Sequence, residues 1–221
     1  MIYLKGEYPV TDRWNFNVIY LGPGSDRGFF PKGTDYIMAV NSTMYTEENS
    51  VTASNFAACQ GDRYNIKTSD SGSAVVIQYP GLKLLENRFY SQRQLDQGNL
   101  SYMDGGTNTT AINPGRLGDP VINYVHFPAG MYQTLHTHPS HRIGLCLQGN
   151  GKVELDHEEF FDIKPGEAFF MRRNTLHNFM CPYQDEDVVL YVFAPDSGTG
   201  PTDEVNPLKV RTYVGQQRVA R

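Results

Sequence analysis

The sequence has few cysteines and no long apolar run. Cys59, Cys146 and Cys181 lie far apart among 221 residues, and none of them belongs to a CxxC pair. An odd number of widely spaced cysteines argues against a disulfide framework and fits a reduced protein. No segment approaches the roughly 20 apolar residues that a membrane-spanning helix needs, and the first residues contain no apolar signal region. We therefore expect a cytoplasmic protein with no membrane partner.

An excess of positive charge is also missing. The chain has 19 Lys and Arg residues against 24 Asp and Glu residues, a formal net charge of −5 at pH 7, and no basic block stands out. Proteins that bind nucleic acid usually carry basic patches that neutralise phosphates. We therefore expect no nucleic-acid partner.

Helical periodicity is scarce as well. The best helix candidate, residues 82–95, has irregular apolar spacing. Elsewhere, short runs of β-branched and aromatic residues alternate with Gly, Pro, Asn and Asp, a pattern typical of β-sandwiches and barrels. The strand candidates of the C-terminal half are residues 121–127, 143–147, 152–155, 159–163, 168–171 and 188–193. The pattern predicts an all-β fold.

The same pattern divides the chain into four parts. Residues 1–100 form a β-rich N-terminal region, residues 101–120 a connector loop or lid, residues 121–195 a more regular β domain, and residues 196–221 a polar C-terminal arm. The N-terminal region has no cluster of metal-ligating residues. We favour its interpretation as a degenerate copy of the C-terminal domain. In the alternative, its strands extend or cover that domain and help to form a dimer. We expect a homodimer.

The histidines of the C-terminal half are spaced like metal ligands. His136 and His138 are two residues apart, so on an extended strand both imidazoles project from the same face. His177 ends a second segment, which begins at Gly166. Three neutral imidazoles on neighbouring strands can hold a divalent transition metal and leave open positions for other ligands. The spacing therefore predicts a metal centre.

The glycines around these histidines complete a resemblance to a known family. The chain resembles the cupin superfamily in the residues that keep the spacing of its two motifs: Gly130, His136, His138, Gly149, Gly166 and His177. Arg172 and Asn174 replace a proline and a glycine of the second motif, and asparagine also accepts left-handed backbone angles. The resemblance implies a cupin jelly-roll barrel over residues 121–195, or a bicupin if the N-terminal region is a degenerate half.

One departure from the motif changes the expected site. Arg142 occupies the place of the motif glutamate, usually a fourth ligand, and arginine cannot deprotonate to bind metal. The expected metal ligands are therefore His136, His138 and His177. The positive charge of Arg142 adds to that of the ion and favours a small anionic substrate. Gln133 lies where cupin decarboxylases carry a polar residue that faces the site, so the resemblance implies that it orients substrate or O2.

The resemblance also implies a mononuclear metal enzyme. Cysteine dioxygenase-like and diketone-cleaving cupins have a similar three-histidine site, bind Fe(II) and activate O2. We therefore expect an Fe(II)- and O2-dependent dioxygenase or oxidase of a small anionic substrate, although imidazole also suits Zn, Ni, Mn and Cu. A second hypothesis is a metal-dependent isomerase or lyase with Tyr124, Tyr132 or His141 as its base. A third is a non-catalytic ligand-binding or structural cupin.

Each candidate residue also has a purely structural interpretation. The three ligand histidines would be hydrogen-bonded core residues of a cupin that has lost its metal, and Arg142 would form an internal salt bridge. His141 is interpreted as an exposed loop residue or, if the loop bulges, as an alternative ligand. Packing or surface positions explain the rest: His126 and His157 on a strand surface and a turn, Cys146 and Cys181 in the core, and residues 160–161 and 169–170, all phenylalanines, in the barrel core.

Overall fold

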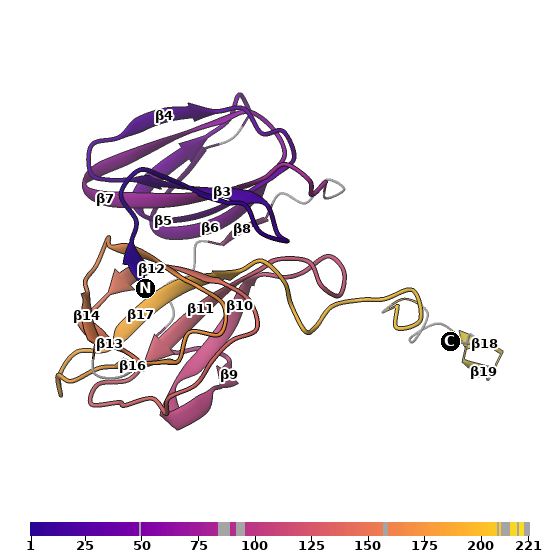
Figure 1. Cartoon of the computed structure of the whole chain (residues 1–221). Coiled ribbons are helices and arrows are strands. Elements are labelled where there is room, and N and C mark those ends of the chain that lie inside the picture. Colours follow the sequence, from indigo (N-terminus) through magenta and orange to yellow (C-terminus); the bar gives the residue numbers. More distant parts are fainter. Residues whose placement is uncertain are drawn as a thin grey trace.

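The computed structural model describes residues 1–48, 50–83, 89–91, 96–156, 159–206, 208, 213–215 and 217–218. Nearly all regular elements in these residues are β-strands, which confirms the predicted all-β class. Figure 1 shows two stacked regions, with the N-terminal strands above and the C-terminal strands below. None of the helices in the described part of the chain is long and apolar enough to cross a membrane.

The N-terminal region forms a curled antiparallel sheet. Its strands follow the order β2-β3-β7-β5-β6-β8, and β4 pairs with another part of β7. The pairing register of β5 and β7 shifts between Val40 and Ser42, at an irregularity that bends the long strands. The strands are β2 Glu7–Val10, β3 Phe16–Leu21, β4 Asp26–Phe29, β5 Thr34–Tyr45, β6 Ser50–Gln60, β7 Tyr64–Tyr79 and β8 Phe89–Ser91.

This curled sheet encloses an apolar core of its own. Phe29 and Tyr64, at one end of the long strands, belong to the same buried cluster as Ile37 at the other end. Tyr36 and Met38, the alternate residues of β5, belong to a second cluster on the opposite face, which packs against the C-terminal region. The N-terminal region is therefore closed by apolar side chains. Its descent from a degenerate cupin half stays a prediction, as does a homodimer.

The C-terminal region combines a large sheet and a small one. The large sheet has the order β1-β15-β12-β17-β11-β10-β9, and the small sheet has the order β14-β13-β16. A short 3-10 helix, η1 Met103–Gly105, precedes β10, and a separate hairpin of β18 Tyr213–Val214 and β19 Gln217–Arg218 lies away from both regions (Figure 1). The strands of the large sheet are β1 Ile2–Tyr3, β9 Leu100–Ser101, β10 Thr107–Ile112, β11 Val121–Phe127, β12 Arg142–Gln148, β15 Ala168–Met171 and β17 Val188–Ala194. Those of the small sheet are β13 Gly151–Leu155, β14 Glu159–Ile163 and β16 His177–Met180.

The large sheet is the middle layer of the molecule. Ile122 and Tyr124 of β11 pack against the N-terminal sheet. Val125 and Phe127 of the same strand point the other way, into the core shared with the small sheet. Both faces are therefore buried at the centre of the sheet, and for this reason β15 and β17 are continuous apolar runs instead of alternating apolar and polar residues.

Three expectations about local structure are wrong. Residues 107–112, expected in a connector loop, form β10, because this polar, threonine-rich segment pairs with β11. Residues 89–91 of the expected helix form β8 beside β6, and residues 84–88 and 92–95 of that helix lie outside the described residues. Phe160, expected in the barrel core, is 56% exposed because β14 is an edge strand of the small sheet.

Candidate metal centre

Two neighbouring segments bring the three ligand histidines together. Residues 132–136 run beside β16, where His136 and His177 exchange both backbone hydrogen bonds, with N–O distances of 2.9 and 3.0 Å. The N–H of Asn174 donates to the carbonyl of His138 at 2.7 Å. Asn174 has a φ of +59°, which confirms that it adopts the left-handed backbone expected at a motif glycine. The two motifs therefore meet at the histidines.

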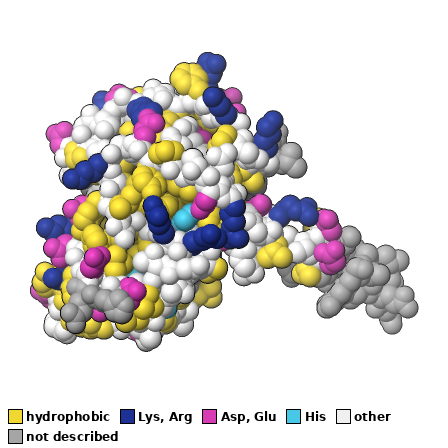
Figure 2. Space-filling view, in the orientation of Figure 1, with side chains coloured by type: hydrophobic (Ala, Val, Ile, Leu, Met, Phe, Trp, Pro, Cys, Tyr) yellow, Lys and Arg dark blue, Asp and Glu magenta, His cyan; other side chains and the backbone are white. Residues whose placement is uncertain are grey.

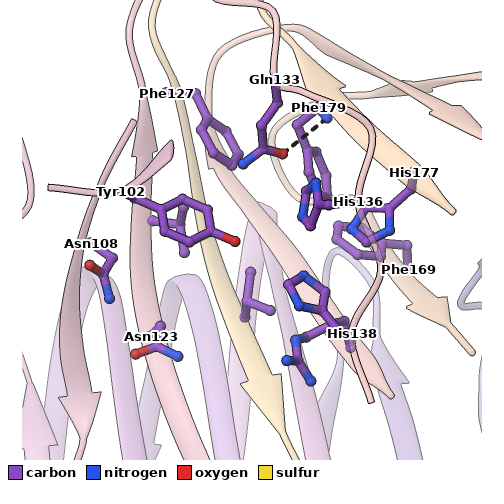
Figure 3. Close-up of a pocket in the computed structure, with 13 residues that line it drawn as sticks. Tyr102, Asn108, Asn123, Phe127, Gln133, His136, His138, Phe169, His177 and Phe179 are labelled. Carbon is purple, nitrogen blue, oxygen red and sulfur yellow. Dashed lines mark hydrogen bonds between the residues drawn. The ribbon is translucent and has the colours of Figure 1, made fainter. Parts of the chain in front are cut away.

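The three imidazoles form a single cluster. Ring centroids are 4.8 Å apart for His136 and His138, 4.4 Å for His136 and His177, and 5.1 Å for His138 and His177. One nitrogen of each ring lies within 4.8 Å of those of the other two, so each ring can offer one ligand to the same ion. Figure 3 shows the rings side by side at the wall of a cavity.

Backbone carbonyls determine which nitrogen two of these rings offer. Nδ1 of His136 lies 2.8 Å from the carbonyl oxygen of Thr134, and Nδ1 of His177 lies 2.8 Å from that of Thr175. A carbonyl oxygen only accepts, so each Nδ1 carries the hydrogen and each Nε2 keeps a free lone pair. Nε2 of His177 is buried and has no hydrogen-bond partner among the described residues. An oriented imidazole with a free lone pair is what a transition metal requires, so the donor set fits such an ion.

Burial also keeps two of the rings neutral. Burial, reinforced by the nearby positive charge of Arg142, lowers the pKa of His138 to about 3. Burial lowers the pKa of His177 to about 4, although its hydrogen bond to Thr175 opposes the shift. Both imidazoles are therefore uncharged at neutral pH, which is the form that binds a metal ion.

Arg142 lines the same cavity and is held by neutral groups. Its Nη1 donates to the carbonyl oxygen of Ser140 at 3.2 Å, to the hydroxyl oxygen of Ser140 at 2.7 Å and to the carbonyl oxygen of His141 at 2.9 Å. Within the described residues Arg142 forms no ion pair, so the internal salt bridge considered for it is not found there. Its positive charge is therefore available to a ligand in the cavity.

Gln133 is buried and also lines this cavity. Its Oε1 accepts the N–H of Phe179 at 3.3 Å, which fixes the orientation of the side-chain amide (Figure 3). Its Nε2 is buried and has no partner among the described residues. An amide donor without a partner at this place can hydrogen-bond a ligand in the cavity.

The cavity beside the histidines has a volume of about 330 Å³. Figure 3 shows Tyr102, Asn108 and Asn123 across the cavity from the histidine rings. None of the described residues that line the cavity is Asp or Glu, and the cation among them is Arg142. Its apolar lining residues are Val125, Phe127, Phe169, Phe179 and Val192.

Sequence reasoning missed the polar residues on this far wall. Asn108 lies on β10 and Asn123 on β11, and they face the same cavity because these strands pair with Asn108 opposite Val125. Tyr102 precedes η1 in the segment that was expected to be a connector. Residues 107–110 are all polar, so no alternation of polar and apolar residues separates a strand from a loop there.

Asp104 connects this segment to the candidate metal ligands. Its carboxylate accepts the N–H of Thr134 at 2.6 Å and the hydroxyl of Thr134 at 3.1 Å. The carbonyl of Thr134 in turn accepts the Nδ1 hydrogen of His136. Asp104 therefore helps to orient His136 without touching it, as outer residues of metal sites commonly do.

Three candidate bases lie outside the cavity. His141 is buried, and its Nε2 lies 2.5 Å from Oδ2 of Asp12, so it is neither an exposed loop residue nor an alternative metal ligand. Tyr124 belongs to the core between the N-terminal sheet and the large sheet. Tyr132 is 59% exposed and does not line the cavity. The base proposed for an isomerase or lyase is therefore none of these three.

The other candidates have structural positions. His126, expected on a strand surface, is buried and pairs with Asp187 at 2.9 Å between Nε2 and Oδ2. His157 lies outside the described residues. Cys146 and Cys181 are buried in the core between the large and small sheets, as expected. Burial raises the pKa of the Cys181 thiol to about 11, so this thiol is protonated at neutral pH.

Comparisons with known proteins place this arrangement among characterised folds. A family model described as a cupin domain matches residues 123–193. Of the solved structures, a cupin 2 conserved barrel domain protein from Leptotrichia buccalis is 17% identical, with a TM-score of 0.54 over 88% of this chain and 92% of that one. A search of curated protein sequences found no match.

Two further solved structures share the fold. AerE from Microcystis aeruginosa is 11% identical, with a TM-score of 0.57 over 87% of this chain and 98% of that one. Salicylate 1,2-dioxygenase from Pseudaminobacter salicylatoxidans is 10% identical, with a TM-score of 0.56 over 82% of this chain and 70% of that one. These likenesses cover both regions of the chain, so the fold extends beyond the part that the family model matches.

Proposed function

We propose that the chain, whose residues 123–193 match a cupin domain, is a mononuclear metal-dependent enzyme. The observation that carries the proposal is the cluster of His136, His138 and His177 at the wall of a cavity, with the Nε2 of His177 buried and without a partner among the described residues. Three imidazoles leave coordination positions for a substrate. Fe(II) is the metal we propose, and Zn, Ni, Mn and Cu are the alternatives that the same donor set accepts.

The proposed substrate is a small organic anion. Among the described residues that line the cavity, Arg142 supplies a permanent positive charge, and its Nη1 is already held by Ser140 and His141. A guanidinium binds a carboxylate with directional, charge-assisted hydrogen bonds. The apolar lining, with Phe127 and Phe169, suits the carbon skeleton of such a molecule and excludes water around it.

The proposed reaction is an O2-dependent oxidation. When bound, Fe(II) would supply the redox chemistry that none of the described side chains in the cavity can supply. The residues of the chain would position the substrate, with Arg142 on its acidic group and the free Nε2 of Gln133 donating to an oxygen atom beside the histidines. A salicylate 1,2-dioxygenase among the proteins of this fold supports this choice of reaction as the first to test.

Oxygen consumption by the reconstituted protein tests the proposal. Metal-free protein would be loaded with Fe(II) or Zn(II) and offered small carboxylates, with salicylate and gentisate first. We expect substrate-dependent O2 uptake with Fe(II), none with Zn(II), and none in Fe(II)-treated His138→Ala. Substrate turnover at the full rate without O2 would contradict oxidation and support an isomerase or lyase. Protein that gains neither activity nor ligand binding with any metal would support a non-catalytic cupin.

A further inference from the structure

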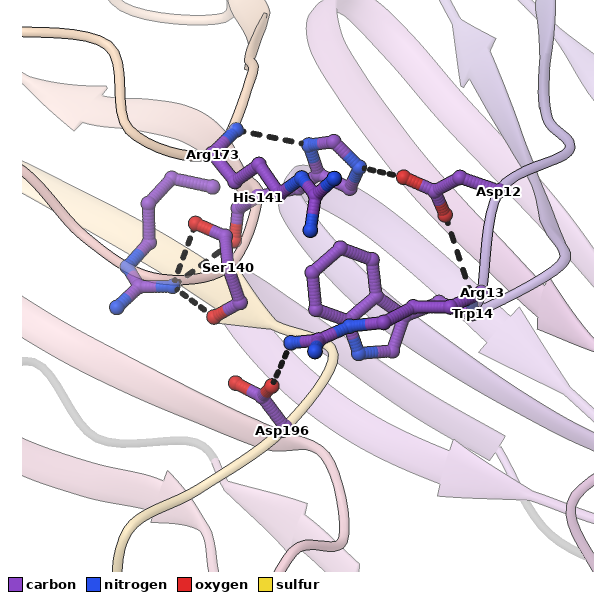
Figure 4. A network of polar contacts seen from close by, with 8 residues as sticks. Asp12, Arg13, Trp14, Ser140, His141, Arg173 and Asp196 are labelled. Atoms are coloured by element: carbon purple, nitrogen blue, oxygen red, sulfur yellow. Dashed lines mark hydrogen bonds and ion pairs between the residues drawn. The ribbon is translucent and has the colours of Figure 1, made fainter.

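A loop of the N-terminal sheet reaches the metal-binding region. In the turn between β2 and β3, Oδ1 of Asp12 accepts the N–H of Trp14 at 3.1 Å. The guanidinium carbon of Arg13 lies 4.1 Å from the Trp14 ring centroid, and Arg13 pairs with Asp196 at 3.3 Å, just beyond β17. Figure 4 shows this loop on one side of the contact and Ser140 and His141 on the other. Figure 2 shows basic side chains beside an acidic one and a histidine where the two regions meet. The loop is therefore held from both regions.

The imidazole of His141 is hydrogen-bonded to the Asp12 carboxylate of this loop. Its ring centroid lies 4.8 Å from that of Trp14 and 5.0 Å from that of Phe170. Its Nδ1 accepts the backbone N–H of Arg173 at 3.0 Å, so its Nε2 carries the hydrogen and donates to Oδ2 of Asp12 at 2.5 Å. Both ring nitrogens are therefore used to join the first motif, the second motif and the N-terminal loop.

The residue after His141 is the cation of the cavity. All three hydrogen bonds from Nη1 of Arg142 go to Ser140 and His141, which form a seat for the guanidinium. Ser140 is 1% exposed, so this seat lies within the packed protein and cannot adjust freely. Among the described residues, the Nε and Nη2 donors of Arg142 have no acceptor, and they remain for a ligand.

We propose that Asp12 is a positioning residue for Arg142, acting through His141, so that the N-terminal region helps to build the anion-binding wall of the metal centre. The proposal rests on the proposed role of Arg142 in binding the substrate. Removal of the Asp12 carboxylate frees Nε2 of His141 and lets the seat of the guanidinium shift. The metal ligands keep their own backbone and carbonyl contacts, so metal binding is retained.

A purely structural tether would predict a different result. Loss of such a tether would lower the stability of the protein but leave the guanidinium and the affinity for anions unchanged. Two measurements therefore decide between the interpretations. One is the Nε–H signal of Arg142 in ¹⁵N-edited NMR spectra, identified by its absence in Arg142→Gln. The other is the dissociation constant of salicylate for protein loaded with Zn(II), measured by calorimetry.

The experiment compares Asp12→Ala, Asp12→Asn and a matched control, Glu7→Ala. Glu7 is a carboxylate of the same sheet that pairs with Arg27 at 2.7 Å and lies outside this network. We expect Asp12→Ala to shift or broaden the Arg142 signal and to weaken salicylate binding about tenfold, as loss of an outer positioning residue commonly does. Asp12→Asn keeps an oxygen that accepts from His141 and should restore affinity to within about twofold of the wild type. Glu7→Ala should change neither measurement.

The possible contradictions are distinct. An unchanged Arg142 signal and unchanged salicylate affinity in Asp12→Ala would overturn the positioning role, whatever the stability of that variant. If Arg142→Gln binds salicylate as tightly as the wild type, but Asp12→Ala still moves the Arg142 signal, the substrate role of Arg142 fails and the positioning role stands. If the wild type does not bind salicylate, the Arg142 signal alone decides.

Discussion

In the N-terminal sheet, Asp35 is fully buried, and burial raises the pKa of its carboxyl group against the hydrogen bonds from Tyr64 at 2.7 Å and Gln78 at 3.2 Å. In the C-terminal region, burial lowers the pKa of His138 to about 3 and that of His177 to about 4. Loss of hydration disfavours the charged form in both places. A carboxyl group whose charged form is disfavoured by an apolar core is a poor metal ligand, whereas a neutral imidazole is a good one. Burial therefore disfavours a charged carboxylate in the N-terminal region, and it keeps two imidazoles of the C-terminal region in the neutral form that can bind metal.

Loss of a histidine from the candidate metal centre should have the largest effect on metal affinity, and this effect should distinguish the two regions. His177→Ala should lower metal affinity by more than the roughly 10–100-fold that loss of a supporting residue costs, because one of three ligands is removed. Titration with Zn(II) measures this affinity. The matched control is Tyr64→Phe, which removes a donor to Asp35 in the N-terminal core. It should lower the free energy of unfolding by about 1–2 kcal/mol and leave metal affinity unchanged. Equal metal affinities for both variants would contradict the comparison.

The charge of Arg142 should have the next largest effect. Arg142→Gln removes a charge-assisted hydrogen-bond donor, and such bonds contribute about 1.5–3 kcal/mol, so anion affinity should fall roughly 10–100-fold. Metal content should stay the same, because Arg142 is not a ligand. Calorimetric titration of the metal-loaded variant with small carboxylates measures the effect. Wild-type affinity for every anion that the wild type binds would show that the cation of the cavity has another role.

Orientation of His136 should matter less than its presence. Asp104→Ala removes the two hydrogen bonds to Thr134, whose carbonyl holds Nδ1 of His136. We expect metal affinity to fall about tenfold, the lower end of the range for outer residues of a metal site. Asp104→Asn keeps one acceptor oxygen for Thr134 and should recover most of this loss. An Asp104→Ala variant with wild-type metal affinity would show that the carbonyl of Thr134 is positioned without Asp104.

The smallest effect concerns the pH dependence of stability without metal. His138 and His177 bind protons less well in the folded state than in the unfolded state, so stability should fall as the pH drops from about 6.5 toward 4. Asp35 binds its proton more tightly in the folded state, so its contribution falls as the pH rises above about 4. Thermal unfolding of the metal-free wild type and of Asp35→Asn at several pH values measures both contributions to stability. Asp35→Asn should lose stability toward acid pH as the wild type does, but it should lack the loss of stability that Asp35 causes as the pH rises above about 4. The opposite slope between pH 6.5 and 4 would contradict the burial of the imidazoles.

Much of the C-terminal region could be predicted from its sequence because its signals are local. The runs at residues 121–127, 159–163 and 168–171 are strands with the expected bounds. The spacing of His136 and His138, and the glycine-like role of Asn174, depend only on strand periodicity and on which residues accept a left-handed backbone. These features follow from single segments of the chain.

The far wall of the cavity and the contact with the N-terminal region could not be predicted because they depend on tertiary pairing. Asn108 and Asn123 share a face only through the register of β10 and β11. Asp12 and His141 are 129 residues apart, and nothing near either residue indicates the other. The apolar character of Phe160 predicts a buried residue, but Phe160 lies exposed on an edge strand. Sequence patterns indicated the candidate metal ligands as well as Gln133 and Arg142, but not Tyr102, Asn108 and Asn123 on the far wall of the cavity.

The metal content of the wild-type protein tests the central claim most directly. Protein purified without oxygen, stripped with a chelator and titrated with Fe(II) should bind one ion per chain, and elemental analysis after desalting should retain it. Binding should disappear in a variant with His136, His138 and His177 all replaced by alanine. A wild-type protein that retains no Fe(II), Zn(II), Ni(II), Mn(II) or Cu(II), or a triple variant that retains metal equally well, would contradict the assignment of these histidines as a metal centre.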